Sequence, residues 1–437
     1  MAEDTYEAPA SGLGTTESLP DSATPKRLVV CCDGTWNDLR GGTLTNVARL
    51  AKSVLPTGRM KVDGHDREVP QVVYYDEGVG VGEGVSPIID ALVKTLGGAL
   101  GRGLDAKIEK AYRFIVLNYT PGDEIFVFGF SRGAYTARSL CGLIRNAGIL
   151  RRSEFELIPA ALDLYRMSEK PSNEEAQAFR RDHSHEIIAG EEDYTDDDRA
   201  LIKAFREKIK IAEEARVIPP EIRRCGIHIR YLGVWDTVGA LGVPSRFQLL
   251  KWLTRKKYRF HDDKASALVA GLRHAIALDE NRAAFDVTLI GNIQELNLLW
   301  AAAEADQQVH APKEAGYVPY FERPYQQLWF PGDHASIGGG WPDQGLSSAA
   351  LLWVAEGAER AGLELERSAG CELQKAFDLC EPGADWPARS GRPDLTQRIG
   401  GALRRKGPAT REEVHPSAFE RQRRFSDYSP AGLARFY

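Results

Sequence analysis

The residues best placed to do chemistry lie in the pentapeptide Gly129-Phe-Ser-Arg-Gly133, whose central residue is Ser131. An apolar, strand-like run precedes this pentapeptide, and a stretch with helical periodicity follows it. A serine on such a strand-to-helix turn is held with its hydroxyl exposed, and Gly129 and Gly133 allow neighbouring backbone to approach closely. The N-terminus of the following helix favours developing negative charge. The pattern therefore predicts that Ser131 is a nucleophile.

A serine hydroxyl needs a base that is oriented by a third group, and in α/β-hydrolases the chain order is Ser, acid, His. His334 follows a predicted strand at 327–330 and precedes a glycine-rich loop. Asp236 directly follows another predicted strand, at 227–235. Because the carboxyl ends of parallel strands form the ligand crevice of such sheets, we expect Ser131, Asp236 and His334 to converge there.

An oxyanion formed at Ser131 would need backbone N–H donors. Arg132, the next residue, can supply one, and the loop after the first predicted strand can supply another from Gly34 or Thr35. Asp33 in the same loop either supports this contact or only caps the turn, and the sequence leaves both roles open.

Further acidic residues lie near the expected base. Asp333, directly before His334, is a candidate supporting residue, and Asp333 and Asp343 are the alternative acids if Asp236 lies elsewhere. No Cys/His cluster has zinc spacing, and the glycines at 78–84 do not match the dinucleotide-binding pattern. We therefore expect neither a metal nor a cofactor.

The elements that must position these residues are short apolar strands alternating with helical segments. Strands are predicted at 27–32, 71–75, 124–128, 227–235 and 327–330. Such strands, apolar on both faces, are typical of a mostly parallel sheet with helices on both faces, which is an α/β fold. Asp279 to Arg282 stand at the end of an apolar stretch that is interpreted as helical, and their role is interpreted as structural.

Composition divides the chain into a polar tail at 1–25 and a single domain at 26–437. Within the domain we predict a charged helical insertion at about 150–222 and an irregular C-terminal wrap at about 381–437. Apolar side chains of the insertion either form an acyl-chain wall beside Ser131 or only seat the insertion on the domain. They are Phe155, Leu157, Ile158, Leu162, Leu164 and Tyr165.

Charge and hydropathy exclude some classes of protein. The net charge of −6 argues against a general nucleic-acid binder. No N-terminal stretch resembles a signal peptide, and no apolar run reaches the length of a membrane span. Six cysteines without a C-x-x-C pair fit a reducing compartment. We expect cytoplasmic synthesis, while export without a signal peptide and peripheral contact with a membrane stay open.

Six ordered motifs resemble those of the bacterial DUF2235 family, which includes type VI secretion phospholipase effectors of the Tle1 class. They are Cys32-Asp-Gly-Thr-Trp-Asn37, Tyr74-Tyr-Asp-Glu-Gly-Val-Gly80, Gly129-Phe-Ser-Arg-Gly-Ala-Tyr135, Val234-Trp-Asp-Thr-Val238, Arg273-His-Ala-Ile-Ala-Leu-Asp-Glu280 and Trp329-Phe-Pro-Gly-Asp-His334. The resemblance covers about residues 26–350. It implies an α/β-hydrolase fold and a Ser-Asp-His triad at Ser131, Asp236 and His334.

Together the residues and the resemblance predict a serine esterase or lipase, with a phospholipid or other lipid ester as substrate. Secretion machinery or an immunity protein are partners that the sequence leaves open. The alternative hypothesis is a non-catalytic interaction protein that retains the hydrolase fold.

Overall fold

The computed structural model describes most of the predicted domain. The described residues are 25–34, 43–62, 65–77, 99–167, 173–185, 228–239, 264–266, 268–298, 300, 322–381 and 405–436. The predicted tail up to residue 24, the glycines at 78–84, the second part of the insertion at 186–222 and the first part of the wrap at 382–404 lie outside the described residues.

The described strands form a seven-stranded sheet in the order β2-β3-β1-β4-β5-β6-β7. Neighbouring strands are parallel, except that β2 runs antiparallel to β3. The strands are β1 (Arg27–Cys32), β2 (Thr57–Val62), β3 (His65–Asp76), β4 (Glu124–Phe130), β5 (His228–Trp235), β6 (Leu272–Ala277) and β7 (Tyr325–Phe330). The predicted α/β class with a mostly parallel sheet is confirmed.

The register aligns the carboxyl ends of the central strands at one edge of the sheet. The last residue of β1 pairs with Gly129 of β4, Phe130 of β4 pairs with Trp235 of β5, and the last residues of β6 and β7 pair with each other. The chain runs outward from β1 to β3 and returns to β4 on the opposite side of β1, so a topological switch point lies between β1 and β4. The central strand β4 therefore delivers Ser131 to the middle of this edge.

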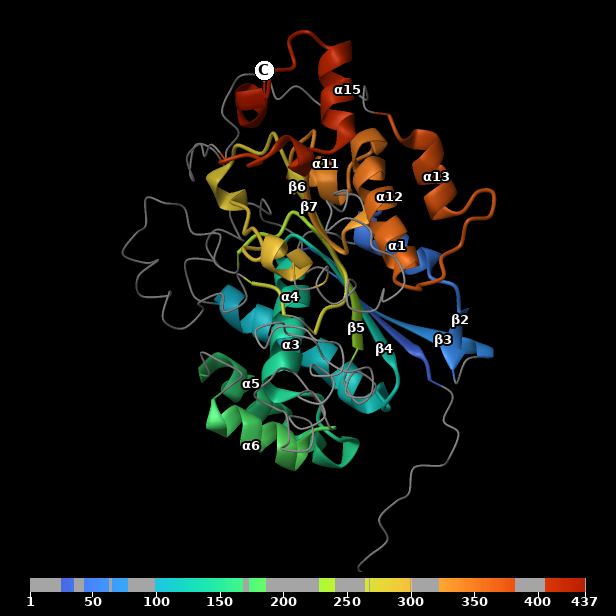
Figure 1. Cartoon of the computed structure of the whole chain (residues 1–437), viewed down its shortest axis with the longest axis vertical. Helices are drawn as coiled ribbons and strands as arrows, with labels where there is room; N and C mark the ends of the chain where they lie inside the picture. The colour runs from blue at the N-terminus through green and yellow to red at the C-terminus, as the bar shows by residue number, and fades with distance from the viewer. Residues whose placement is uncertain are drawn as a thin grey trace, which may run out of the picture.

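Helices cover both faces of the sheet. Successive residues of β4 point to opposite faces, so its apolar side chains need packing partners on both sides. Ile125 and Val127 pack with α3 (Ala99–Asn118) and α4 (Arg132–Ala147). Phe126 and Phe128 face the opposite core, which includes residues of α1 (Asn46–Ser53), α12 (Gly345–Arg360) and α13 (Glu372–Leu379). Figure 1 shows the two helical layers on either side of the strands.

Two strands of the sheet were not predicted from the sequence. The stretch before Asp279 was expected to be helical, but it forms the fully buried strand β6. A strand buried on both faces shows no alternation of polar and apolar residues, so its Ala, Ile and Leu also fit a helix. The strand β2 is largely exposed at the edge of the sheet and has no apolar run to mark it.

The described part of the insertion packs on the helices rather than on the strand ends. It contains η2 (Arg152–Leu157), α5 (Ile158–Met167) and α6 (Glu174–His183), which contact α3 and α4. Its apolar side chains, Leu164 and Tyr165 among them, join the core on that face of the sheet. These contacts seat the insertion on the domain, and the acyl-chain wall beside Ser131 stays a prediction. Figure 1 shows α5 and α6 at the end of the molecule opposite α11 (His334–Gly338).

The last described stretch, 405–436, is called here the C-terminal segment. It contains η7 (Arg411–Glu413), α15 (Pro416–Arg424) and η8 (Ala431–Phe436), so the predicted irregular wrap is partly helical. Val414 forms a bridge with Trp329 of β7, and Ala418 and Leu433 share a hydrophobic cluster with Ile276 of β6. The C-terminal segment therefore covers the β6–β7 side of the sheet (Figure 1).

Candidate active site

Ser131 occupies a strained turn between β4 and α4. Its φ of 58° and ψ of −121° lie in a region that L-amino acids rarely adopt. The Ser131 N–H donates to the carbonyl of Trp235 at 3.0 Å, which ties the turn to the end of β5. The turn thus fixes the serine at the N-terminus of a helix, as its sequence context predicts.

The two glycines beside Ser131 are required by close backbone contacts. A Cβ on Gly129 would lie 2.4 Å from the carbonyl oxygen of Gly133, and a Cβ on Gly133 would lie 2.1 Å from that of Cys32. Both neighbours are backbone atoms, which cannot move aside as a flexible side chain could. Only glycine at both positions permits this sharp turn against β1.

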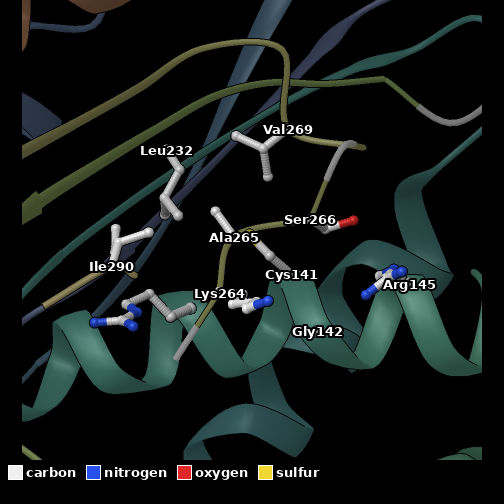
Figure 2. A pocket seen from close by; sticks show the side chains of 10 residues that line it. Cys141, Gly142, Arg145, Leu232, Lys264, Ala265, Ser266, Val269 and Ile290 are labelled. Carbon is white, nitrogen blue, oxygen red and sulfur yellow. The ribbon is translucent and has the colours of Figure 1, made fainter. Parts of the chain in front are cut away.

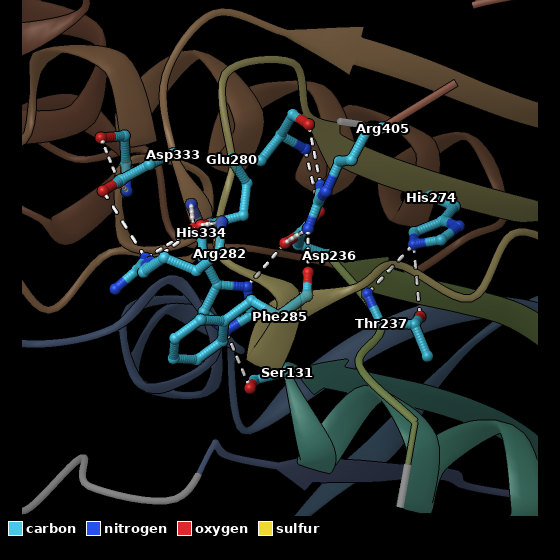
Figure 3. A network of polar contacts seen from close by, with 12 residues as sticks. Ser131, Asp236, Thr237, His274, Glu280, Arg282, Phe285, Asp333, His334 and Arg405 are labelled. Carbon is cyan, nitrogen blue, oxygen red and sulfur yellow. Dashed lines mark hydrogen bonds and ion pairs between the residues drawn. The ribbon is translucent and has the colours of Figure 1, made fainter. Parts of the chain in front are cut away.

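His334 contacts both of its expected partners. Its Nδ1 lies 2.6 Å from Asp236 Oδ2, and its Nε2 lies 2.8 Å from Ser131 Oγ. An ionised aspartate can only accept, so Nδ1 carries the proton and Nε2 of the neutral ring accepts from the serine hydroxyl. The structure therefore brings Ser131, Asp236 and His334 together at the ends of β4, β5 and β7, as Figure 3 shows.

Two aromatic rings hold the imidazole of His334. The ring centroids of Phe130 and Phe285 each lie 4.7 Å from that of His334, at tilted angles. Phe130 ends β4, and Phe285 ends the short helix η5 (Ala283–Phe285). Gly338 lies against the Phe130 ring, where a Cβ would approach within 2.0 Å. Packing as well as hydrogen bonding therefore sets the orientation of the imidazole.

Asp236 is fully buried and has four hydrogen-bond donors around its carboxylate. Besides His334, these are the Ala277 N–H at 2.9 Å and the Arg405 guanidinium, which donates to Oδ1 at 2.7 Å and to Oδ2 at 2.9 Å. Burial alone would raise the pKa of Asp236, but the charge of Arg405 and the bond from His334 outweigh it. The pKa of Asp236 is therefore held well below the usual range of an aspartate.

The predicted supporting residue Asp333 lies at the N-cap of α11 and not at the imidazole. Its Oδ1 accepts from the N–H and the hydroxyl of Ser336 at 3.0 and 2.8 Å. Arg282 lies 3.7 Å from its other oxygen and is paired with Glu280 at 2.5 Å. Glu280 in turn accepts from the His334 N–H at 3.2 Å. Asp333 therefore supports the backbone of the loop that carries the base.

His274 of β6 is a neutral, fully buried neighbour of this network. Its Nε2 accepts from the Thr237 N–H at 3.2 Å, and its Nδ1 lies 3.0 Å from Gln327 Oε1. Burial, together with the charge of Arg138, lowers the pKa of His274 to about 3. His274 therefore holds the residue after Asp236 in place without carrying charge at neutral pH.

Of the residues expected around an oxyanion, the structure describes Gly34 and Arg132. Asp33 accepts from the Gly34 N–H at 2.6 Å, from Thr45 Oγ1 at 2.5 Å and from Tyr75 Oη at 2.7 Å, so it anchors its own loop. The Gly34 N–H would have to turn away from Asp33 to serve an oxyanion. Arg132 begins α4, where a backbone N–H has no acceptor within the helix. Thr35 lies outside the described residues, and the oxyanion roles stay predictions.

The alternative acid Asp343 is exposed and accepts from the Gly345 N–H at 3.0 Å. The chain does not bring it to His334 in place of Asp236. Within the ranges described above, no group of three or more His, Cys, Asp or Glu side chains is arranged to hold a metal ion.

Several residues of this site were not predicted to belong to it. Arg405 stands in a basic run with Arg404 and Lys406, which would ordinarily be interpreted as solvent-exposed. Glu280 and Arg282 were interpreted as structural residues at a helix end, but they follow β6 and contact the loop of His334. No local pattern marks Arg405, because its partner Asp236 lies 169 positions earlier in the chain.

A separate small pocket lies along the second half of α4 (Figure 2). The cationic side chains Arg138, Arg145 and Lys264 line it together with the apolar Leu232 and Ile290. None of Ser131, Asp236 and His334 lines this pocket, so it is distinct from the site at the strand ends.

Comparisons with known proteins show which family model the chain matches. The profile described as "T6SS, Phospholipase effector Tle1-like, catalytic domain" matches residues 26–357. An uncharacterized protein of Saccharomyces cerevisiae is 26% identical over 272 residues, which cover 60% of this chain and 32% of that protein. The chain thus spans about a third of this curated relative.

Two solved structures share low identity with the chain. The Tle1 effector bound to the VgrG spike of the type 6 secretion system is 16% identical, with a TM-score of 0.33 and coverage of 75% of this chain and 53% of that one. An uncharacterized protein from Pseudomonas aeruginosa is also 16% identical, with a TM-score of 0.37 and coverage of 82% and 50%. Among the described helices, none is both long and apolar enough to cross a membrane.

Proposed function

The chain belongs to the family of Tle1-like phospholipase effector catalytic domains, and on this premise we propose that it is a serine hydrolase of carboxylic esters. We propose phospholipids or other lipid esters as its substrates, because the family is named for phospholipase effectors. The observation that carries the proposal is the contact of one imidazole with both a buried aspartate and a strained serine, at 2.6 and 2.8 Å.

The proposed reaction is acyl transfer to water. Ser131 Oγ attacks the ester carbonyl while His334 Nε2 takes the hydroxyl proton, and Asp236 stabilises the imidazolium that forms. The tetrahedral intermediate collapses to an acyl-serine, and His334 returns the proton to the departing alcohol. Water then attacks the acyl-serine with His334 again as base, which releases the carboxylic acid and restores Ser131.

The oxyanion of the tetrahedral intermediate is proposed to lie at the N-terminus of α4. The Arg132 N–H would donate to it, and an N–H of the loop after β1 would supply the second donor. Aligned backbone N–H groups at a helix N-terminus favour negative charge at this position.

A fluorophosphonate probe, which labels activated serines, tests the proposal directly. We expect labelling of the protein and hydrolysis of short esters, both lost in Ser131→Ala by about 10⁴-fold or more in kcat. Ser139→Ala, a buried serine of the same helix, is the matched control and should keep both. Folded protein without labelling would favour the non-catalytic alternative. Ser131→Ala with more than a few per cent of the activity would instead show that Ser131 is not the nucleophile.

A second measurement tests the substrate class. The ratio of kcat/KM for long-chain and short-chain esters, and the release of fatty acid from phospholipid vesicles, separate a lipase from a general esterase. Hydrolysis of short soluble esters alone would reject lipid substrates while leaving the serine mechanism intact.

A further inference from the structure

Arg405 reaches the catalytic acid from a part of the chain outside the family profile. The profile ends at residue 357, and Arg405 lies beyond it in the chain. The Arg405 side chain is almost fully buried and donates to both oxygens of Asp236. Figure 3 shows Asp236 between Arg405 on one side and His334 on the other.

Two further hydrogen bonds hold the Arg405 guanidinium in place. Its Nη1 also donates to the Ala277 carbonyl at 2.8 Å, and its Nη2 donates to the Phe285 carbonyl at 2.5 Å. Ala277 ends β6, and Phe285 contacts the imidazole of His334. The guanidinium therefore joins the acid, the end of the neighbouring strand and the helix η5 that packs on the base.

A bidentate contact restricts the orientation of a carboxylate more than a single hydrogen bond does. A planar guanidinium that donates to both oxygens fixes the plane of the carboxylate as well as its position. Once that plane is fixed, Oδ2 of Asp236 can point only toward Nδ1 of His334. The positive charge also compensates a carboxylate that burial would otherwise penalise.

We propose that Arg405 is a positioning residue of the proposed hydrolase, which orients Asp236 and makes the C-terminal segment an obligatory part of the active site. This inference rests on the proposed function. A second contact supports it, because Tyr428 of the C-terminal segment donates to Asp279 at 2.8 Å. Asp279 accepts from the Gly332 N–H at 2.7 Å, in the loop that leads to His334.

The charge of Arg405 also bears on the pH dependence of the reaction. Other charged groups face the base from the β6 loop and from the N-cap of α11, and Asp286 faces Arg405. These groups are Asp236, Glu280, Arg282, Asp286, Asp333 and Arg405, while the neighbouring His274 is neutral. Removing Arg405 takes away the positive charge that lowers the pKa of Asp236 against the effect of burial, so the pKa of this aspartate should rise. Because a protonated Asp236 no longer stabilises an imidazolium, the acidic limb of the kcat/KM profile should then move to higher pH.

The test compares Arg405→Gln, Arg405→Lys and a matched control, Arg180→Gln. Arg180 is a buried arginine of α6 that donates to the carbonyls of Arg145 and Asn146. We expect Arg405→Gln to lower kcat by about 10–100-fold, with KM changed by less than about twofold. Arg405→Lys, which keeps the charge, should restore the acidic limb and part of kcat.

Arg180→Gln should lower the melting temperature but leave kcat per folded molecule and the acidic limb unchanged. Equal losses in Arg405→Gln and Arg180→Gln that follow the folded fraction, with an unmoved limb, would overturn the positioning role. Wild-type protein without esterase activity or probe labelling would instead overturn the proposed function. The two failures are therefore distinguishable.

Discussion

Replacing Ser131 by glycine should stabilise the protein relative to replacing it by alanine. Both changes remove the hydroxyl and its bond to His334, so they differ only in the Cβ and in backbone freedom. An L-residue at φ 58° and ψ −121° carries strain of about 1–3 kcal/mol, which glycine does not. Glycine loses about 0.5–1 kcal/mol more conformational entropy on folding. The net expectation is that Ser131→Gly exceeds Ser131→Ala by about 0.5–2 kcal/mol in the free energy of unfolding.

Urea unfolding at neutral pH measures this difference, provided that both variants have the same m value. Ser139, in the middle of α4, is the control position, and there the usual helical order should hold, with alanine about 1 kcal/mol more stable than glycine. The reversal of order between the two positions is the signature of strain at Ser131. If Ser131→Ala were as stable as Ser131→Gly, the turn would not be strained and the argument from its geometry would fail.

Two further predictions concern the glycine contacts and the buried histidine. Gly133→Ala should lower the free energy of unfolding by several kcal/mol and abolish activity, because its Cβ would lie 2.1 Å from the Cys32 carbonyl oxygen. Gly103→Ala, whose Cβ would have nothing within 4 Å, should instead stabilise α3 by about 0.5–1 kcal/mol. Thermal melts of the two variants test this difference, and equal melting temperatures would contradict it. The pKa of the buried His274 is lowered to about 3 in the folded protein. As the pH falls below about 6.5, this histidine therefore takes up a proton in the unfolded chain but not in the folded one, and the free energy of unfolding should drop by about 1.4 kcal/mol per pH unit from this group. Wild type should therefore lose more stability than His274→Gln between pH 6.5 and 4, and parallel pH profiles of the two would refute the assignment.

The sequence was most informative where a short buried strand is followed at once by a polar residue. Ser131, Asp236 and His334 each follow such a strand, directly or within a short loop, and parallel strands bring their carboxyl ends to one edge. Local apolar runs and the topology of α/β sheets therefore suffice to predict that these three residues, which are up to 203 positions apart, lie together.

Residues whose role depends on a distant partner could not be predicted in this way. Nothing in the neighbourhood of Arg405 distinguishes it from Arg404, because its burial is created by the docking of the C-terminal segment on β6 and β7. Asp333 was expected to support the base because it precedes His334, and it lies at the N-cap of α11, where its side chain contacts Ser336 rather than the imidazole. Adjacency in the chain predicts the backbone location of a residue, but the direction of its side chain depends on the packing around it.

The position of Arg405 after all seven strands has a consequence for synthesis. A ribosome makes the strands, and with them Ser131, Asp236 and His334, before it makes Arg405. Because domains generally fold as units, the sheet needs the C-terminal segment as well as the strands to reach its final packing. Until that segment leaves the ribosome and docks on β6 and β7, the carboxylate of Asp236 lacks its cationic partner. The order of translation therefore makes the contact between Arg405 and Asp236 one of the last of this site to form.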